Sequence, residues 1–409
     1  MKKLFVFALA LCLLLPGCAV QDNPGQTTPE TTGKEDPFNS PEPMPGFDAD
    51  NRYIIEGGVR IQEAGSVFFG GMGQFIRYYD TASGVTGVMC PNPECTHDSP
   101  ACGAHVENSS STCYYNGKRY WVSADPQGGC GDYYLWRSDL SGENREKVKR
   151  ISFNDVILPY QPQWYAIHRG KLYFFGKKGR LKDGNVVMRY VLMSTPLDSS
   201  EEYIPIFDET YECGVDMTVR FVGNAIYRST MFYNAAVSNL TDVVVTRYDR
   251  ETGAAETLFE EKGFALYPKK FWVTEDGTLY LGGNGKDCVT VWKLENGKKV
   301  EFLSRQGSSP RVELTGGVVV CHYLKDGKIW GEVITLSGET LFNGWVYPNS
   351  IPGMEEDPNG GCSRIFLGGD GDKIFVQLTP KDQKERNYTI MLDIRSGMKA
   401  TVLWSNEER

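Results

Sequence analysis

The chain has 409 residues and a formal net charge of −9, and 41% of its residues are hydrophobic, as in a folded globular protein. Lysine and arginine form no cluster longer than a few residues, so this acidic chain is a poor candidate for binding nucleic acid. Beyond the N-terminal segment no apolar run approaches the roughly eighteen residues of a membrane-spanning helix. The sequence therefore excludes a multi-pass membrane protein and a basic nucleic-acid binder.

The N-terminus has the features of an export signal. Two lysines precede a twelve-residue apolar run, Leu4 to Leu15, which is too short to span a bilayer. The run ends in LPGC, which resembles the bacterial lipobox. The resemblance implies that residues 1–17 are a removed signal peptide and that Cys18 carries acyl chains such as palmitate. Because two acyl chains anchor a protein stably, we expect an extracytoplasmic protein attached to the cell membrane by lipid, with plain secretion as the alternative.

A polar, proline-rich segment follows the lipobox. From Ala19 to Asp50 the chain holds six of its 21 prolines among Thr, Ser, Glu and Asp, with almost no apolar side chains. Such a segment cannot bury enough apolar surface to offset the entropy of ordering it. We therefore expect residues 18–50 to be a disordered tether that holds the folded part away from the membrane.

The rest of the chain is built from repeats. A glycine followed by a short aromatic or β-branched segment occurs at Gly65, Gly117, Gly170, Gly223, Gly277, Gly316 and Gly371. Each segment precedes a second apolar segment and a turn rich in Asp, Ser and Gly, as in YYLWRSDLSG and YTIMLDIRSG. Such turns between alternating apolar residues indicate β-hairpins. A third segment follows the turn and a further one precedes the glycine, so that each unit supplies four strands.

Seven units of four strands predict an all-β fold, a seven-bladed β-propeller over residues 51–409. The first unit is compact, and its inner strand is expected from residues 51–58, NRYIIEGG. Six blades plus an irregular cap are therefore the alternative count, and a double β-sandwich is a more distant alternative.

Three cysteines and two histidines lie within residues 90–105, CPNPECTHDSPACGAH. On the repeat, residues 90–112 form a Cys/His-rich insert that connects the outer strand of the first blade to the inner strand of the second. Thiolate and imidazole ligands together suit tetrahedral zinc, and four protein ligands close its coordination shell. The spacing predicts a structural zinc site of Cys90, Cys95, His97 and Cys102, with His105 as an alternative fourth ligand.

Disulfide bonds are the rival interpretation, because exported proteins favour them over free thiols. Two bridges would come from Cys90, Cys95, Cys102, Cys113 and Cys130. A disulfide clip has no need of His97, which makes this histidine the discriminating residue. A catalytic metal would need an open coordination position and a nearby general base, and no residue of the insert is marked out for either role.

Other polar residues do not assemble into a site. Asp370 and Asp372 lie in a glycine-rich turn, and residues 355–357 form a short acidic run, but neither has the full calcium loop with its terminal glutamate. Calcium is therefore not expected as a cofactor. His168 and His322 stand alone on predicted strands or turns, where packed or solvent-facing side chains are expected. No catalytic residue is assigned.

Aromatic residues in long connections are the candidate ligand site. The connections predicted on the face that carries the insert contain Tyr160, Phe232, Tyr233, Trp345 and Tyr347. Aromatic side chains in loops on a rigid ring suit recognition of a glycan or a protein. The alternative is that these side chains only pack their own loops against the ring.

The D-x-x-G turns of the blades and the C-x4-C-x-H-x4-C insert after an early blade resemble those of lipid-anchored, propeller-like proteins of Gram-positive gut bacteria of the Firmicutes type. The resemblance covers most of residues 51–409 and implies the propeller fold and a cell-surface location, but no established activity.

These features together predict a membrane-anchored β-propeller lipoprotein that binds a protein partner or a glycan at the cell envelope. A propeller-type glycan hydrolase or lyase is the alternative, and it would need two carboxylates about 5 to 10 Å apart. A scaffold of the envelope without a small-molecule ligand is the second alternative.

Overall fold

The computed structural model describes residues 61–106, 112–124, 133–151, 164–182, 185–198, 203–233, 241–264, 267–347, 351, 362–381 and 385–406. The predicted signal peptide, the predicted acylation site Cys18 and the predicted tether lie outside these ranges, as do Cys130 and Tyr160.

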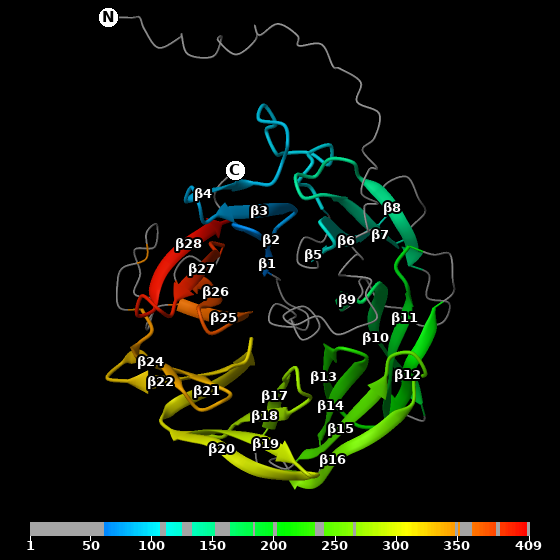
Figure 1. The fold of residues 1–409 in the computed structure, drawn as a ribbon, viewed down its shortest axis with the longest axis vertical. Coiled ribbons are helices and arrows are strands. Elements are labelled where there is room, and N and C mark those ends of the chain that lie inside the picture. Colours follow the sequence, from blue (N-terminus) through cyan, green and yellow to red (C-terminus); the bar gives the residue numbers. More distant parts are fainter. Residues whose placement is uncertain are drawn as a thin grey trace, which may run out of the picture. The chain divides into compact units, whose positions relative to one another are not determined.

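The described residues form 28 strands and no helix, and the strands make seven four-stranded antiparallel sheets. The sheets lie around one axis as the blades of a ring, in chain order from blue to red (Figure 1). The fold is therefore a seven-bladed β-propeller, as the repeats predict, and the alternative count of six blades is wrong. A helix that could cross the membrane is not found anywhere in the described ranges.

Each blade consists of four consecutive strands. The first blade contains β1 (Ile61–Ala64), β2 (Val67–Met72), β3 (Phe75–Asp80) and β4 (Val85–Val88). The second contains β5 (Cys113–Tyr115), β6 (Lys118–Ala124), β7 (Tyr133–Asp139) and β8 (Glu146–Ile151). The third contains β9 (Trp164–His168), β10 (Lys171–Lys182), β11 (Asn185–Pro196) and β12 (Ile204–Tyr211). The fourth contains β13 (Val215–Val222), β14 (Ala225–Tyr233), β15 (Thr241–Asp249) and β16 (Ala255–Phe264).

The remaining three blades repeat this order. The fifth contains β17 (Tyr267–Val273), β18 (Leu279–Asn284), β19 (Cys288–Glu295) and β20 (Lys298–Gln306). The sixth contains β21 (Ser308–Thr315), β22 (Val318–Lys325), β23 (Lys328–Thr335) and β24 (Thr340–Trp345). The seventh contains β25 (Cys362–Gly369), β26 (Lys373–Pro380), β27 (Tyr388–Asp393) and β28 (Lys399–Ser405). In Figure 1 the first strand of each blade lies nearest the axis of the ring.

The inner strand of the first blade differs from the prediction. It is β1, which completes the four-stranded sheet with β2, β3 and β4, so placing it at residues 51–58 was wrong; those residues lie outside the described ranges. The sequence IQEA of β1 buries only Ile61 fully and is otherwise polar or small. Such a short strand gives little alternation to recognise.

The recurrent glycines mark the turns before the second strand of each blade. Asn116 and Gly117, between β5 and β6, have φ angles of 47° and 72°. Two consecutive left-handed residues make a turn whose twist matches that of the flanking strands. Six of the seven glycines have positive φ, and the exception is Gly371. In that turn the carboxylate of Asp370 accepts hydrogen bonds from the backbone N–H groups of Asp372 and Lys373.

The hydrophobic core is divided among the junctions between blades. Seven clusters of buried apolar residues occur, and each joins two neighbouring blades. Successive side chains of a strand point to opposite faces of its sheet, so one strand serves two junctions. In β15, Val243 and Val245 pack toward the fifth blade, whereas Tyr248 packs toward the third.

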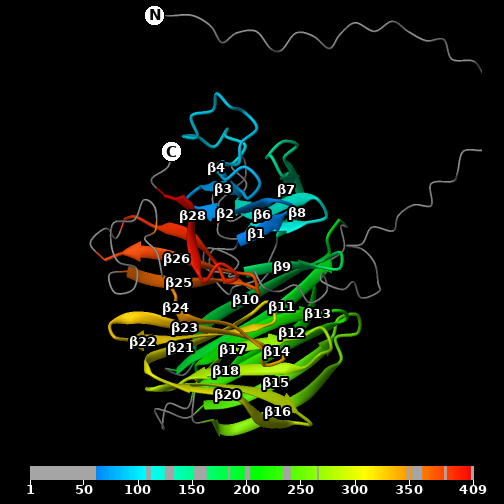
Figure 2. The same cartoon turned by 60° about the vertical axis from the view of Figure 1, so that its left-hand side comes forward.

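Within the described residues the ring closes without exchange of a strand between the first and last blades, since each is made of four consecutive strands. Phe375 meets Phe68 edge to face at 5.2 Å between ring centroids. The hydroxyl of Thr86 donates a hydrogen bond of 2.5 Å to the carbonyl of Leu403. Figure 2 shows β28 beside the first blade, with the sixth blade following the seventh around the ring. Side-chain packing therefore holds the ends of the ring together.

Candidate functional site

The insert between β4 and β5 brings four potential metal ligands together. The ligand atoms of Cys90, Cys95, His97 and Cys102 all lie within 4.8 Å of one another. Nδ1 of His97 is 3.3 Å from Sγ of Cys102. These four residues, called the Cys/His cluster below, are the group that the sequence spacing predicts.

His105, the alternative fourth ligand, is not a member of this group. Its backbone forms an isolated β-bridge with Phe75, and its ring meets that of Phe75 edge to face at 5.5 Å. The eight cysteines in the described ranges are thiols, among them Cys113, and Cys130 lies outside those ranges.

The end of the insert is fixed on the first blade. The backbone N–H of Ile76 donates to the carbonyl of Ala104 at 3.0 Å, and the N–H of Val106 donates to the carbonyl of Gln74 at 2.8 Å. Cys102, Ala104 and Val106 are buried. Because the insert continues the pairing of β3 in this way, Cys102 is held by the sheet and not by a free loop.

Two tight turns direct the remaining ligands toward Cys102. The N–H of Cys95 donates to the carbonyl of Asn92 at 3.2 Å, and the N–H of Cys102 donates to that of Ser99 at 3.1 Å. His97 adopts a left-handed conformation with φ of 54°, which is uncommon for a residue with a side chain. Strained residues of this kind concentrate at functional sites.

The second blade contacts the insert on the side opposite the first blade. A Cβ atom added at Gly142, in the β7–β8 turn, would lie 2.4 Å from the carbonyl oxygen of Gly103. A Cβ added at Gly103 would lie 2.7 Å from Cδ of Pro91. Both positions therefore require glycine, and the insert lies in contact with both neighbouring blades.

The thiols of the cluster differ in acidity. Burial raises the pKa of Cys102 to about 12, and the neighbouring thiols add to the effect. Burial also opposes ionisation of Cys90, but hydrogen bonds from the backbone of Asn92 and Gly103, together with those from the thiols of Cys102 and Cys95, outweigh it and lower the pKa of Cys90. Without a cation the cluster would thus keep a proton on Cys102.

Two arginines of the second blade lie beside the cluster. Arg119 is 0% exposed, and burial lowers its pKa to about 9, with a smaller contribution from the charge of Arg145. Its Nη2 donates to the carbonyl of Gly103 at 2.8 Å, while its Nη1 has no hydrogen-bond partner within the described ranges. Arg145 lies over the ring of Trp121 at 5.1 Å and donates to the carbonyl of His105.

The donor set and its surroundings fit zinc. Three thiolates and a neutral imidazole are ligands of structural zinc sites, and they would leave the occupied site with one negative charge. Arg119 and Arg145 supply positive charge at this place: burial lowers the pKa of both arginines, and the neighbouring Cys102 and Cys90 partly oppose this effect. Four protein ligands leave no open position for a substrate, so the group is suited to a structural role.

Arg119 and Arg145 were not found by reasoning from the sequence. They follow the cysteines in the chain but belong to the next blade, so no local spacing links them to the cluster. The only signal is that Arg119, in the segment GKRYW, occupies a position of the apolar alternation where a buried side chain is expected.

The predicted aromatic ligand residues lie in different blades. Phe232 packs in the cluster between the third and fourth blades and meets Tyr211 edge to face at 5.3 Å. Tyr233 donates its hydroxyl to the carboxylate of Asp216 on the inner strand β13. Phe232 therefore packs at the junction of the third and fourth blades, whereas Tyr233 packs against the cluster between the fourth and fifth blades.

The other two described aromatics belong to the sixth blade. Trp345 meets Trp330 of the neighbouring strand edge to face at 4.9 Å. Tyr347 is only 6% exposed and lines a cavity between the sixth and seventh blades. The aromatics are therefore distributed over several junctions.

Comparison with known proteins gives the fold alone. No protein-family model matches the chain, and no curated protein matches it in sequence. A puromycin hydrolase is 14% identical with a TM-score of 0.46, and the match covers 89% of this chain and 56% of that protein. Dipeptidyl peptidase 4 of Porphyromonas gingivalis is 11% identical with a TM-score of 0.43, and the match covers 86% of this chain and 54% of that enzyme.

The β-propeller domain of the Trilobed protease from Pyrococcus furiosus is 10% identical with a TM-score of 0.41, and the match covers 82% of this chain and 95% of that domain. The chain spans about half the length of the puromycin hydrolase and of the dipeptidyl peptidase.

Proposed function

We propose that the chain is a lipid-anchored, extracytoplasmic β-propeller that acts as a binding module at the cell envelope, and that its Cys/His cluster holds one structural zinc ion. The observation that carries the zinc assignment is the convergence of four ligand atoms within 4.8 Å. The zinc ion would tie the insert between the first two blades into a fixed conformation.

The structural role is supported by what surrounds the cluster. Cys102 is buried, and the nearby Ala104 and Val106 are hydrogen-bonded to the first blade. Arg119 and Arg145 contact the insert from the second blade. Occupation of the cluster would therefore stiffen one junction of the ring. Binding of zinc releases the thiol protons, and the one negative charge of the occupied site would offset part of the positive charge of the two arginines.

The membrane anchor and the location are supported by the N-terminal sequence alone. A short apolar run ends in LPGC at Cys18, and a polar, proline-rich segment separates it from the propeller. Substitution Cys18→Ser should move the protein from the membrane fraction to the soluble fraction. Retention of the variant in the membrane would contradict the lipid anchor.

A glycan hydrolase finds no support among the described inner strands. Their acidic residues are Glu63, Asp216 and Glu313. Each is ion-paired with a lysine, at 3.3 Å to Lys373, 3.4 Å to Lys269 and 2.5 Å to Lys270 respectively. A catalytic pair needs one acid that is protonated and one that is available as a base or nucleophile. We therefore favour binding of a protein or a glycan over hydrolysis.

The zinc assignment is tested by metal analysis and thiol counting on the purified protein. We expect about one zinc ion per chain in the wild type and in His105→Ala, and none in His97→Ala. Removal of zinc with a chelator should make Cys90, Cys95 and Cys102 accessible to alkylation without a reductant. Absence of metal together with thiols that react only after reduction would show a disulfide clip and overturn the assignment.

A further inference from the structure

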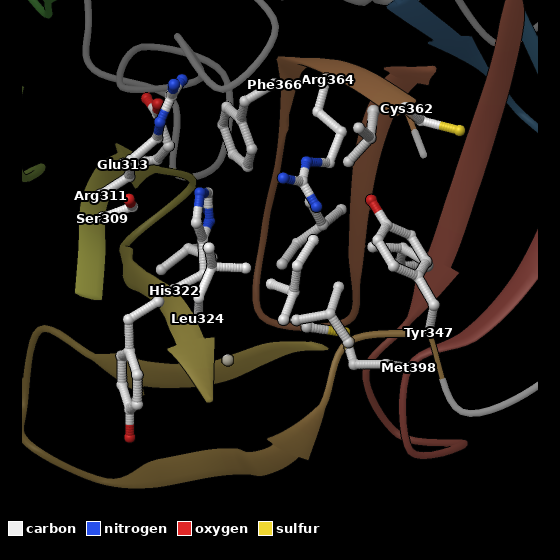
Figure 3. Close-up of a pocket in the computed structure, with 18 of the residues that line it drawn as sticks. Ser309, Arg311, Glu313, His322, Leu324, Tyr347, Cys362, Arg364, Phe366 and Met398 are labelled. Atoms are coloured by element: carbon white, nitrogen blue, oxygen red, sulfur yellow. The ribbon is translucent and has the colours of Figure 1, made fainter. Parts of the chain in front are cut away.

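A cavity of about 430 Å³ lies between the sixth and seventh blades, distinct from the Cys/His cluster. Strands β21, β22 and β23 line one side of this inter-blade cavity, and β25, β26 and β27 line the other. Cavities of several hundred Å³ are typical of small-molecule sites. Figure 3 shows His322 and Arg364 pointing toward each other from the two sides.

Strand alternation explains why these residues share the cavity. Arg311 and Glu313 lie two residues apart on β21 and therefore point to the same face. Arg311 is paired directly with His322 of β22. From the seventh blade, Arg364 lies on the inner strand β25. Both inner strands thus present an arginine to the same space.

The charges at this polar part of the cavity do not balance. Glu313 forms an ion pair of 2.5 Å with Lys270 of β17, which cancels one positive charge. Arg311 is exposed and forms no ion pair or hydrogen bond within the described ranges. Arg364 lies close enough to Arg311 that the charge of Arg311, together with the larger effect of burial, lowers the pKa of Arg364. Among the described residues that line the cavity, Arg311 therefore supplies a positive charge that no ion pair cancels.

His322 adds a neutral donor beside these charges. Burial, followed by the charges of Arg364, Arg311 and Lys270, lowers the pKa of His322 to about 4, so the imidazole is neutral at pH 7. It makes no hydrogen bond within the ranges that the structure describes. Tyr347, which lines the same cavity, is 6% exposed.

Another part of the cavity lining is apolar. It consists of Val320, Ile329, Ile374, Val376, Leu392 and Met398. These side chains belong to the hydrophobic cluster that joins the sixth and seventh blades. A ligand that reached this part would leave water and contact the core of the junction, which favours an apolar group.

We propose that the inter-blade cavity binds a small organic anion, with its carboxylate or phosphate head group between Arg311, His322 and Arg364 and its apolar body against the core of the junction. Guanidinium groups bind both head groups through charge-assisted hydrogen bonds. The inference rests on the binding role proposed above and gives that role a ligand class.

The test uses nuclear magnetic resonance of the purified full-length protein with labelled histidine. The chain has four histidines, and the variant His322→Gln assigns the signal of His322. Hexanoate and hexyl phosphate are the probes. Hexanamide has the same apolar chain without the charge, and acetate has the charge without the chain. The shift of the His322 signal during titration gives the affinity of each compound. We expect at least one probe to bind with an affinity at least about tenfold higher than that of hexanamide or acetate.

Matched variants locate the head group. Arg311→Gln and Arg364→Gln should each lower the affinity for the tighter-binding probe by about tenfold or more, as expected for the loss of one charge-assisted hydrogen bond. Arg247→Gln, on β15 of the fourth blade, removes an exposed arginine 3.7 Å from Glu256 and should leave the affinity unchanged. Because Arg311 has no ion pair to lose in the described ranges, Arg311→Gln should unfold at the wild-type temperature.

The relative affinities of hexanoate and hexyl phosphate identify the head group. The proposal is overturned if neither probe binds, if hexanamide binds as tightly as the charged probes, or if Arg311→Gln binds like the wild type. Zinc content and the membrane attachment are measured independently of these titrations. If the protein holds zinc and is attached to the membrane but binds neither probe, the proposal of an anion in the inter-blade cavity is refuted, while the zinc site and the lipid anchor are not.

Discussion

Acidification tests the environment of His322 through the stability of the fold. Burial and the charges of Arg364, Arg311 and Lys270 lower the pKa of this histidine from 6.5 to about 4. Glu313 also faces the cavity, but it is ion-paired with Lys270. In the unfolded chain the imidazole would titrate with its ordinary pKa.

The free energy of unfolding depends on pH because the folded and unfolded states bind different numbers of protons at His322. Between pH 6.5 and about pH 4 the unfolded chain binds a proton at His322 that the folded protein does not bind. The free energy of unfolding therefore falls as the pH falls through this window, and the loss is complete near pH 4. At about 1.4 kcal/mol per pH unit, the difference between 6.5 and about 4 corresponds to at most about 3 to 4 kcal/mol.

The assay compares the wild type with His322→Gln, which keeps a polar side chain that does not titrate. Urea unfolding, followed by tryptophan fluorescence at several pH values, gives the midpoint of each protein. Other groups titrate equally in both proteins, so the difference between the midpoints isolates His322. The wild type should lose stability relative to His322→Gln as the pH falls from 6.5 to 4. Parallel curves, or a His322 resonance that titrates near pH 6.5, would refute the reasoning.

Three further predictions concern the cluster, the ring closure and a turn. Arg119→Met removes a buried cation beside the thiolates and should lower the affinity for zinc by about tenfold or more. Competition with a chromophoric chelator measures this affinity, and an unchanged value would show that the arginine does not influence metal binding. Phe375→Ala removes a fully buried ring from the junction of the first and seventh blades and should cost about 3 to 5 kcal/mol of unfolding free energy; a loss below about 1 kcal/mol would contradict closure by packing. Gly316 has φ of 46°, and an added Cβ would lie 2.3 Å from the carbonyl oxygen of Gly369, whereas Gly327 has φ of 74° and open space. Gly327→Ala should lower the free energy of unfolding by about 1 to 2 kcal/mol, the cost of a left-handed conformation for a residue with a side chain. Gly316→Ala should lower it clearly more, and equal losses in thermal or urea unfolding would contradict the close approach.

The blades were predictable because their signals are local. A glycine turn followed by an apolar strand, as at Gly117 before Lys118–Ala124, requires only neighbouring residues to be recognised. The first inner strand was missed because Ile61–Ala64 is short and mostly polar. Its place in the sheet is set by pairing with β2, for which its own sequence gives no pattern.

The two candidate sites differ in the same way, because one is formed by residues close in sequence and the other by residues of two blades. Cys90, Cys95, His97 and Cys102 lie within one connection, so their spacing was enough to predict their convergence. The inter-blade cavity depends on Arg311 and His322 from one blade and Arg364 from the next. In the sequence His322 stands alone; strand pairing within the sixth blade brings Arg311 to it, and only the packing of two sheets face to face brings Arg364. Arg119 and Arg145 were missed for the same reason.

The most direct test of the account is X-ray absorption at the zinc edge on the purified protein. A zinc ion in the Cys/His cluster should show three sulfur ligands at about 2.3 Å and one nitrogen ligand at about 2.0 to 2.1 Å. In His97→Ala this signature should be lost, while in His105→Ala it should be the same as in the wild type. Absence of zinc in the wild type, or a shell without sulfur, would contradict a zinc ion in this cluster.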